Sequence, residues 1–162
     1  MDSNSLQTAE GLGVLHLFCK ISEQLFHNKK GKLFQAIETA RASSMQVVTV
    51  SILGHKADVA FMVLSNDWAQ LRSFQTAVAA SGLEIVDSYV SLTEISEYAQ
   101  GVPEEMRNAR LYPELPPDDK KAWCFYPMSK RRNPTQNWFT LPFEKRKELM
   151  YEHGASGRKF SG

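Results

Sequence analysis

Hydrophobic residues of this chain gather in short runs that glycine and polar residues separate. Residues 12–21 (LGVLHLFCKI) form one such run, and its length and flanks are typical of a strand. The β-branched run 46–53 (QVVTVSIL) and the run 58–64 (DVAFMVL) are joined by a compact turn at 54–56, which predicts a hairpin. A fourth strand is expected at residues 84–96 (EIVDSYVSLTEIS).

Two segments between these runs have helical character. Residues Leu33–Arg41 have helical composition and follow the breaker-rich stretch HNKKGK. The segment Trp68–Ala80 repeats apolar residues at helical spacing, and Asp67 is placed to cap it while Gly82 is placed to end it. The repeating apolar residues are Trp68, Leu71, Phe74 and Val78.

The predicted order of elements is β-α-β-β-α-β, which is the α+β ferredoxin-like arrangement. In this fold two helices cover one face of an antiparallel sheet, and the other face needs a partner. We therefore expect a flexible start at residues 1–11 and a ferredoxin-like domain over residues 12–100.

The rest of the chain begins a second unit of the same kind. Four prolines between residues 101 and 121 predict a linker without regular structure over 101–120. After it, Lys121–Lys130 predicts a new strand and Pro142–His153 a new helix, with Gly154 just past its end. Residues 121–162 would thus be the β-α start of a second ferredoxin-like half.

Charge and composition narrow the classes of partner. The 19 basic and 18 acidic residues leave a net charge of +1, so we expect no nucleic-acid partner and only local capture of anions. No run approaches the roughly 18 apolar residues of a membrane span. The start MDSNSLQTAEG lacks the order of a signal peptide, which predicts a cytoplasmic protein without a membrane span.

The chain has two cysteines, Cys19 and Cys124, and both lie inside apolar stretches. Their spacing is not that of a metal-binding pair. Buried free thiols are therefore expected, with a disulfide or a metal pair as the alternative.

The stretch CFYPMSKRR, residues 124–132, has an alternating pattern. On a strand, Cys124, Tyr126, Met128 and Lys130 share one side, so a phenol, a soft packing group and a cation face one space. Pro127 cannot donate to a ladder, which favours an edge position. The alternative interpretation is an aromatic core strand that ends in a solvated basic tail.

His153 is a candidate metal ligand at the end of the second predicted helix. Leu149 and Met150 lie one turn before it, so the imidazole would emerge from an apolar face. The alternative is a cation that compensates the helix dipole next to a glycine cap.

Arginines are the candidate anion binders besides Lys130. Arg110 in ARLYPELP and the pair Arg131-Arg132 carry the planar fork that suits carboxylates. For Arg131 and Arg132 the alternative is a solvated face. The chain contains no glycine-rich phosphate loop, no CxxC pair and no HExxH motif.

Several motifs together resemble the chlorite dismutase-like family, and within it the hydrogen peroxide-dependent coproheme decarboxylases that make haem b. They are YPMSKRR, the following NWFTLPFEKRKELMYEHG and the ending GRKF. The upstream segments GHKADVAFMVLS, SYVSLTEISEY and ARLYPELP also resemble this family, in the same order. The resemblance extends from about residue 12 to the end of the chain.

The resemblance implies an enzyme that converts two propionates of iron coproporphyrin III to vinyl groups with hydrogen peroxide as oxidant. The iron porphyrin would be both cofactor and substrate. Tyr126 would be the catalytic radical, Lys130 would lie near the reacting propionate, and His153 would be the proximal iron ligand. Other family members instead dismutate chlorite, and a haem-binding carrier without turnover is a further alternative.

The resemblance also implies further contacts and partners. Arg110 would contact a propionate, Met128 would line the pocket beside the porphyrin, and Tyr89 would be a further propionate contact. The family forms pentamers of subunits that pair two ferredoxin-like halves, and a transient contact with coproporphyrin ferrochelatase is expected. Its members continue beyond GRKF with a sheet and a helix that supply the distal side of the porphyrin.

Overall fold

The computed structural model describes residues 6–23, 25, 30–99 and 101–160. These residues divide into two compact units. The first unit runs up to Ile95 and also takes in Val102–Lys121. The second unit consists of Ser96–Gly101 and the chain from Ala122 onward.

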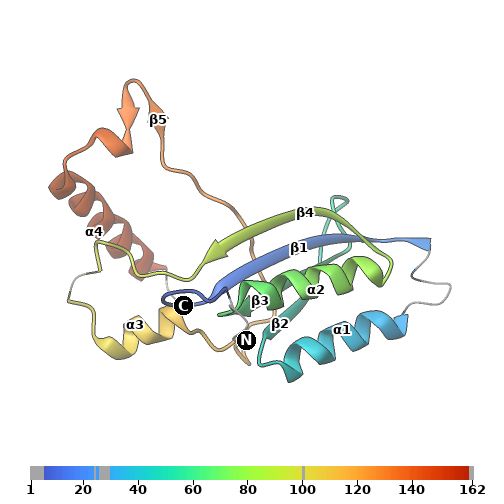
Figure 1. Cartoon of the computed structure of the whole chain (residues 1–162). Coiled ribbons are helices and arrows are strands. Elements are labelled where there is room, and N and C mark those ends of the chain that lie inside the picture. The colour runs from blue at the N-terminus through green and yellow to red at the C-terminus, as the bar shows by residue number, and fades with distance from the viewer. Residues whose placement is uncertain (1–5, 24, 26–29, 100, 161–162) are drawn as a thin grey trace. The chain divides into compact units, whose positions relative to one another are not determined.

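The first unit contains the predicted β-α-β-β-α-β order (Figure 1). Its elements are β1 (Gly13–Ile21), α1 (Lys30–Ala42), β2 (Gln46–Ser51), β3 (Val59–Ser65), α2 (Trp68–Ala80) and β4 (Leu83–Leu92). The four strands form one sheet in the order β2-β3-β1-β4, and all their pairings are antiparallel. Both helices lie on the same face of the sheet, so the ferredoxin-like prediction is confirmed.

The side chains of β1 alternate between the two faces of the sheet, and those on one face form part of the core of this unit. Leu15, Leu17 and Cys19 point to the helix side and are buried, and Leu17 lies opposite Phe61 of β3. The Phe61 ring meets the Phe74 ring of α2 edge-on at 5.8 Å between centroids. Sheet and helices thus bury one shared apolar layer.

Local signals at both ends of α2 act as predicted. The Asp67 side chain accepts a hydrogen bond from the Ala69 backbone N–H at 2.8 Å, which satisfies one of the free donors of the first turn. Gly82 follows the last turn with φ +95°, a left-handed conformation that glycine adopts without a steric penalty.

Residues 101–120 were expected to lack regular structure, and that expectation is wrong. They contain α3 (Glu104–Leu111). Pro103 precedes its first turn, Glu104 and Glu105 suit the positive end of the helix dipole, and Arg110 suits the negative end. Leu111 is buried. Prolines therefore flank this helix rather than prevent it.

Hydrogen bonds connect the end of α3 to residues just before β1 and just after β4. The Thr93 hydroxyl donates to the Leu111 carbonyl at 2.7 Å, and the Gly11 N–H donates to the Tyr112 hydroxyl at 3.2 Å. β4 itself ends at Leu92, earlier than the predicted Ser96. The backbone of the segment that carries Arg110 is thereby fixed to the sheet.

The second unit contains a short hairpin and one long helix. Its elements are β5 (Arg132–Asn133), β6 (Gln136–Asn137), the 3₁₀ turn η2 (Trp138–Thr140) and α4 (Phe143–Lys159). The strand predicted over Lys121–Lys130 does not form. A strand requires a partner ladder, and no described residue pairs with this segment, in which Pro127 also lacks an N–H.

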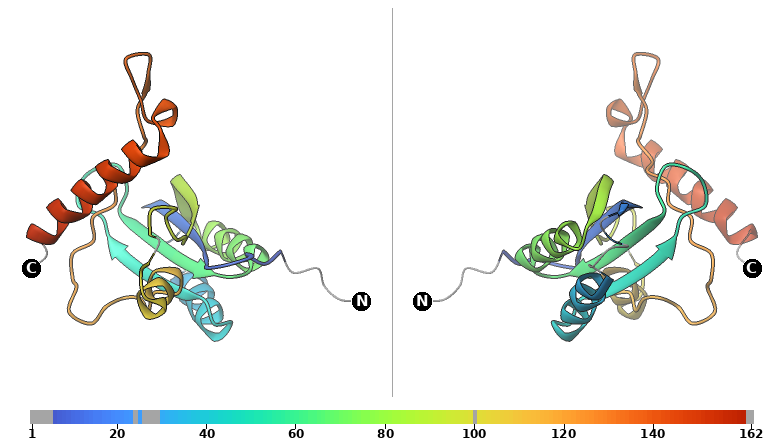
Figure 2. Two further views of the ribbon diagram at one scale, coloured as in Figure 1. Left: turned by 90° about the vertical axis from the view of Figure 1, so that its left-hand side faces the viewer. Right: turned by 90° about the vertical axis from the view of Figure 1, so that its right-hand side faces the viewer.

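Helix α4 continues past the predicted stop at Gly154 and ends at Lys159. Figure 2 shows it as one uninterrupted helix near the C-terminus. A glycine inside a helix is unfavourable by about 1 kcal/mol but does not end it by itself. Arg158 and Lys159 in the last turn favour the later end, because cations stabilise the negative end of the dipole. No helix in the described part of the chain is long and apolar enough to cross a membrane.

Candidate functional site

Tyr126 and Met128 lie on an extended segment that belongs to no sheet among the described residues. Their side chains are 67% and 77% exposed, and Trp123 and Phe125 nearby are also partly exposed. The interpretation of this stretch as a core strand is therefore wrong. The segment offers a phenol and a thioether to solvent or to a ligand.

The two free cysteines differ in their surroundings. Cys19 is buried in the sheet, and burial raises the pKa of its thiol to about 11. Cys124 is exposed, so its predicted burial is wrong. The reason is that the segment that carries it joins no ladder.

Lys130 has two close neighbours in the second unit. Its Nζ atom lies 4.3 Å from the centre of the Trp138 ring and 3.8 Å from the Sδ atom of Met150 on α4. Met150 precedes His153 by three residues, so both lie on one side of the helix. The fold thus brings the Lys130 cation to the helix that carries His153, one turn away from it.

His153 is exposed and lies within α4, six residues before its last residue, Lys159. The last turn of the helix holds Arg158 and Lys159 instead. Compensation of the helix dipole therefore does not account for His153. Among the described residues no group of three or more histidine, cysteine or acidic side chains could hold a metal ion.

Arg131 and Arg132 are exposed, as the solvated-face interpretation expects, but each has a neighbour. The Arg131 guanidinium donates to the Gln136 side-chain oxygen. The Arg132 guanidinium lies 4.4 Å from the centre of the Phe139 ring. A pocket of about 370 Å³ adjoins this hairpin, and Lys130 and Arg131 line it.

Tyr89 and Arg110 belong to the first unit, whereas Tyr126, Lys130 and His153 belong to the second. Tyr89 pairs across the sheet with His16 and meets the Phe18 ring edge-on at 6.3 Å. His16 alternates with the core residues of β1, so this group lies on the face away from the helices.

Burial lowers the pKa of His16, which favours its neutral form. Arg110 stands exposed in the last turn of α3, a short helix anchored to the sheet.

Sequence reasoning missed an aromatic cluster around Arg146. The Tyr98 ring stacks on Phe143 at 5.4 Å and meets Trp138 edge-on at 6.2 Å. Arg146 pairs with Glu97 at 3.0 Å. Burial and the Glu97 side chain raise the pKa of Tyr98, against the effect of the Arg146 cation.

Trp138 was also missed, although a sequence signal existed. The turn residues Asn133-Pro134 after the basic run indicate a chain reversal, which would bring the residues behind them back toward Lys130. The contact with Met150 carries no such signal, because it joins residues on separate elements.

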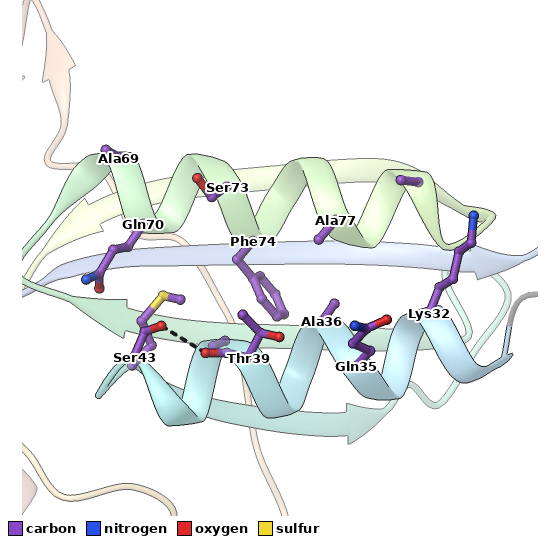
Figure 3. A pocket seen from close by; sticks show the side chains of 13 residues that line it. Lys32, Gln35, Ala36, Thr39, Ser43, Ala69, Gln70, Ser73, Phe74 and Ala77 are labelled. Atoms are coloured by element: carbon purple, nitrogen blue, oxygen red, sulfur yellow. Dashed lines mark hydrogen bonds between the residues drawn. The ribbon is translucent and has the colours of Figure 1, made fainter.

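A groove of about 640 Å³ lies between α1 and α2 (Figure 3). Alanine, serine and threonine line most of it, above the Phe74 ring, and Lys32 is the charged residue among the described lining. None of the predicted site residues lies there. Its side chains offer no arrangement of acid, base or nucleophile.

Sequence and structure comparisons relate this chain to known proteins. The family described as "Chlorite dismutase" matches residues 27–162 of this chain. A coproheme decarboxylase of Staphylococcus carnosus is 36% identical, over 99% of this chain and 72% of that protein. A coproheme decarboxylase of Staphylococcus saprophyticus is 41% identical, over 69% of this chain and 48% of that protein.

A solved structure is also similar. It is described as a heme-binding protein from Thermus thermophilus, and it superposes with a TM-score of 0.78 at 27% sequence identity. The match covers 93% of this chain and 68% of the other. The chain is thus shorter than these relatives, of which it spans between 48% and 72%.

Proposed function

The chain belongs to the chlorite dismutase family, and from this membership we propose that it is a coproheme decarboxylase that uses hydrogen peroxide. Each step converts one propionate of iron coproporphyrin III to a vinyl group. The side chain loses carbon dioxide, one proton and two electrons, and hydrogen peroxide takes up the two electrons with two protons to give two molecules of water. Two such steps yield haem b.

The observation that carries this proposal is the position of Lys130 beside Met150, one turn from His153. An iron porphyrin with propionates needs one axial ligand, cations for its carboxylates and apolar side chains for its ring. Exposed His153, Lys130 and Met128 have these chemical types. The residues present therefore fit such a group.

Each residue has a distinct role in this proposal. The imidazole of His153 binds the iron, and the ammonium of Lys130 holds the reacting propionate. Arg110 and Tyr89 hold further propionates, and Met128 packs against the ring. When bound, the iron porphyrin supplies the oxidising power together with peroxide.

Tyr126 carries the radical chemistry in this proposal. After the phenol has lost one electron and its proton to the oxidant that peroxide supplies, the phenoxyl oxygen takes a hydrogen atom from the β-carbon of the propionate, which restores the phenol. The remaining carbon radical would give its second electron to the same oxidant, while the bond to the carboxylate breaks to release carbon dioxide and leave the vinyl group. The protein contributes mainly by positioning the phenol and the propionate. An exposed phenol is open to such a ligand.

The test is a titration of the purified chain with iron coproporphyrin III, followed by absorbance, then by addition of peroxide and mass spectrometry of the products. We expect a spectrum of a histidine-ligated iron and stepwise loss of two carboxyl groups. Tyr126→Phe should retain binding and lose the product. His153→Ala should lose the spectrum and regain it with added imidazole.

Haem binding without turnover is the second candidate, because the similar Thermus thermophilus structure is described as a heme-binding protein. In that case porphyrin binds, peroxide yields no product, and Tyr126→Phe changes nothing. Oxygen release from added chlorite would instead indicate a chlorite dismutase. Pentamer formation and contact with ferrochelatase stay predictions.

A further inference from the structure

Three consecutive cations, Lys130, Arg131 and Arg132, enter the β5–β6 hairpin, and the hairpin gives each of them a neighbour. The Trp138 N–H donates to the Arg131 carbonyl at 3.0 Å, so the chain folds back directly onto the basic run. Because of this reversal the Trp138 ring reaches Lys130 and the Phe139 ring reaches Arg132. The basic run and the residues after the hairpin thus form two cation–π pairs.

Lys130 contacts both an aromatic ring and a sulfur atom. Its ammonium lies over the Trp138 ring at 4.3 Å and within 3.8 Å of the Met150 sulfur, a weak acceptor. No carboxylate of the described residues lies within ion-pair distance of it. An aromatic face and a thioether therefore hold the cation in place without neutralising its charge.

This arrangement suits a cation that must receive a carboxylate. An acidic partner would compete with the ligand for the ammonium, and a Lys130 without neighbours would lose side-chain entropy when it binds. We propose that Trp138 is a positioning residue, which together with Met150 holds the ammonium of Lys130 at α4 to receive a ligand carboxylate. The identity of that carboxylate as a porphyrin propionate rests on the proposed function.

The first test needs no porphyrin. In protein labelled with ¹³C-lysine, the ε-methylene protons of Lys130 should resonate upfield of those of other lysines because of the Trp138 ring current. Lys130→Met assigns the signal by its loss. The upfield shift should shrink in Trp138→Phe and vanish in Trp138→Leu. A Lys130 signal at the position of a solvated lysine in the native protein would overturn the proposal.

The neighbouring pair supplies the matched control. Phe139→Leu removes the ring over Arg132 and should leave the Lys130 signal in place. Circular dichroism should show that the helix content of each variant is unchanged. A loss of the Lys130 shift in Phe139→Leu would mean that the hairpin as a whole, and not Trp138, sets the position of the ammonium, and this also overturns the proposal.

The second test measures affinity for iron coproporphyrin III in a double-mutant cycle. Trp138→Leu should weaken binding about two- to fivefold, which corresponds to one exposed cation–π contact. In the Lys130→Met background the same change should have no further effect, because Trp138 acts through Lys130. Equal weakening in both backgrounds would indicate a structural role and overturn the proposal.

The two tests also separate this inference from the proposed function. If the chain does not decarboxylate the porphyrin, the proposed function fails, while the lysine signal and the binding cycle still report on Trp138. If decarboxylation proceeds and the Lys130 signal is that of a solvated lysine, the positioning role fails alone.

Discussion

At the scale of single residues, the same chemical group has different properties at different places in this chain, as the two thiols show. Cys19 is fully buried between sheet and helices, and Cys124 is exposed on an extended segment. Both were expected to be buried, because both follow aromatic or aliphatic residues. Local composition predicts burial only where another element covers the segment.

The first prediction concerns the pH dependence of stability through Cys19. Its thiol pKa is raised from 9.0 to about 11 in the folded chain, so the thiolate forms more readily in the unfolded chain. The neutral Cys19 thiol therefore contributes to the free energy of unfolding below pH 9. This contribution, roughly 2 to 3 kcal/mol, is lost as the pH rises toward 11. Urea unfolding across this range measures it.

The matched variant is Cys19→Ala, which should be less stable than the native chain at every pH. Because it has no thiol at this position, its free energy of unfolding should fall less between pH 9 and pH 11. An equal alkaline decrease in both proteins would contradict the prediction.

The second prediction concerns Gly11, which has φ +68°. A Cβ atom there would lie 2.5 Å from the Thr93 carbonyl oxygen, so Gly11→Ala combines strain with a clash against backbone. We expect a loss of stability of at least about 1 kcal/mol. Gly31→Ala is the control, because nothing lies within 4 Å of its Cβ position. Chemical unfolding should show a lower free energy of unfolding for Gly11→Ala than for Gly31→Ala. Equal values for the two variants would contradict the predicted clash.

At the scale of elements, residues that often interrupt helices did not interrupt two helices of this chain. Prolines suggested an unstructured linker where α3 forms, and Gly154 suggested a stop inside α4. In each case the rest of the segment had helical character, with acidic residues near the start and basic residues near the end. The helix propensity and the charge distribution of the whole segment therefore outweigh a few unfavourable residues.

The third prediction tests where α4 ends. Gly154 lies inside the helix, and a Cβ atom added there would lie 3.8 Å from the Arg158 side chain, an ordinary contact distance. Gly154→Ala should therefore stabilise α4 by about 1 kcal/mol and raise the helical signal in circular dichroism. If Gly154 instead ended the helix in a left-handed conformation, alanine would destabilise it. Gly54→Ala, at φ +113°, is the control that should lose stability.

At the scale of the whole molecule, the two units differ in how much they bury. Every described residue of the hydrophobic core belongs to the first unit, and no described residue of the second unit is buried. Contacts within the second unit involve exposed or half-buried side chains, such as the rings around Tyr98, the Arg146–Glu97 pair and Lys130 with Trp138. Its stability should therefore depend more on what binds to it. The predicted domain limits at 100 and 120 stay a prediction.

The fourth prediction follows from this difference. In hydrogen exchange, amides of β1 and β3 should be strongly protected, and those of α4 weakly protected. Iron coproporphyrin III should raise the protection of α4 and leave that of β3 unchanged, because ligand binding stabilises the part that it contacts. Strong protection of α4 without ligand would contradict this expectation.

Local patterns along the chain are enough to predict the ferredoxin-like unit. Its elements follow from local signals, and each predicted element forms within a few residues of the expected position. The signals are the alternation of buried and half-buried residues in β1, the hairpin turn at 54–56, and Asp67 and Gly82 at the ends of α2. The resemblance of the motifs to the chlorite dismutase family also needed no structure, because it depends on the order of residues along the chain.

Which side chains meet depends on how the elements pack together. Two examples are the contact of Lys130 with Met150 and the stacking of Tyr98 on Phe143, because each joins residues that are distant in the chain. A third is the exposure of Cys124, since no other element covers its segment. Periodicity reports the faces of one element, whereas contact and burial depend on the element that packs against it. For the same reason the strand expected over Lys121–Lys130 did not form, since a strand exists only with a partner.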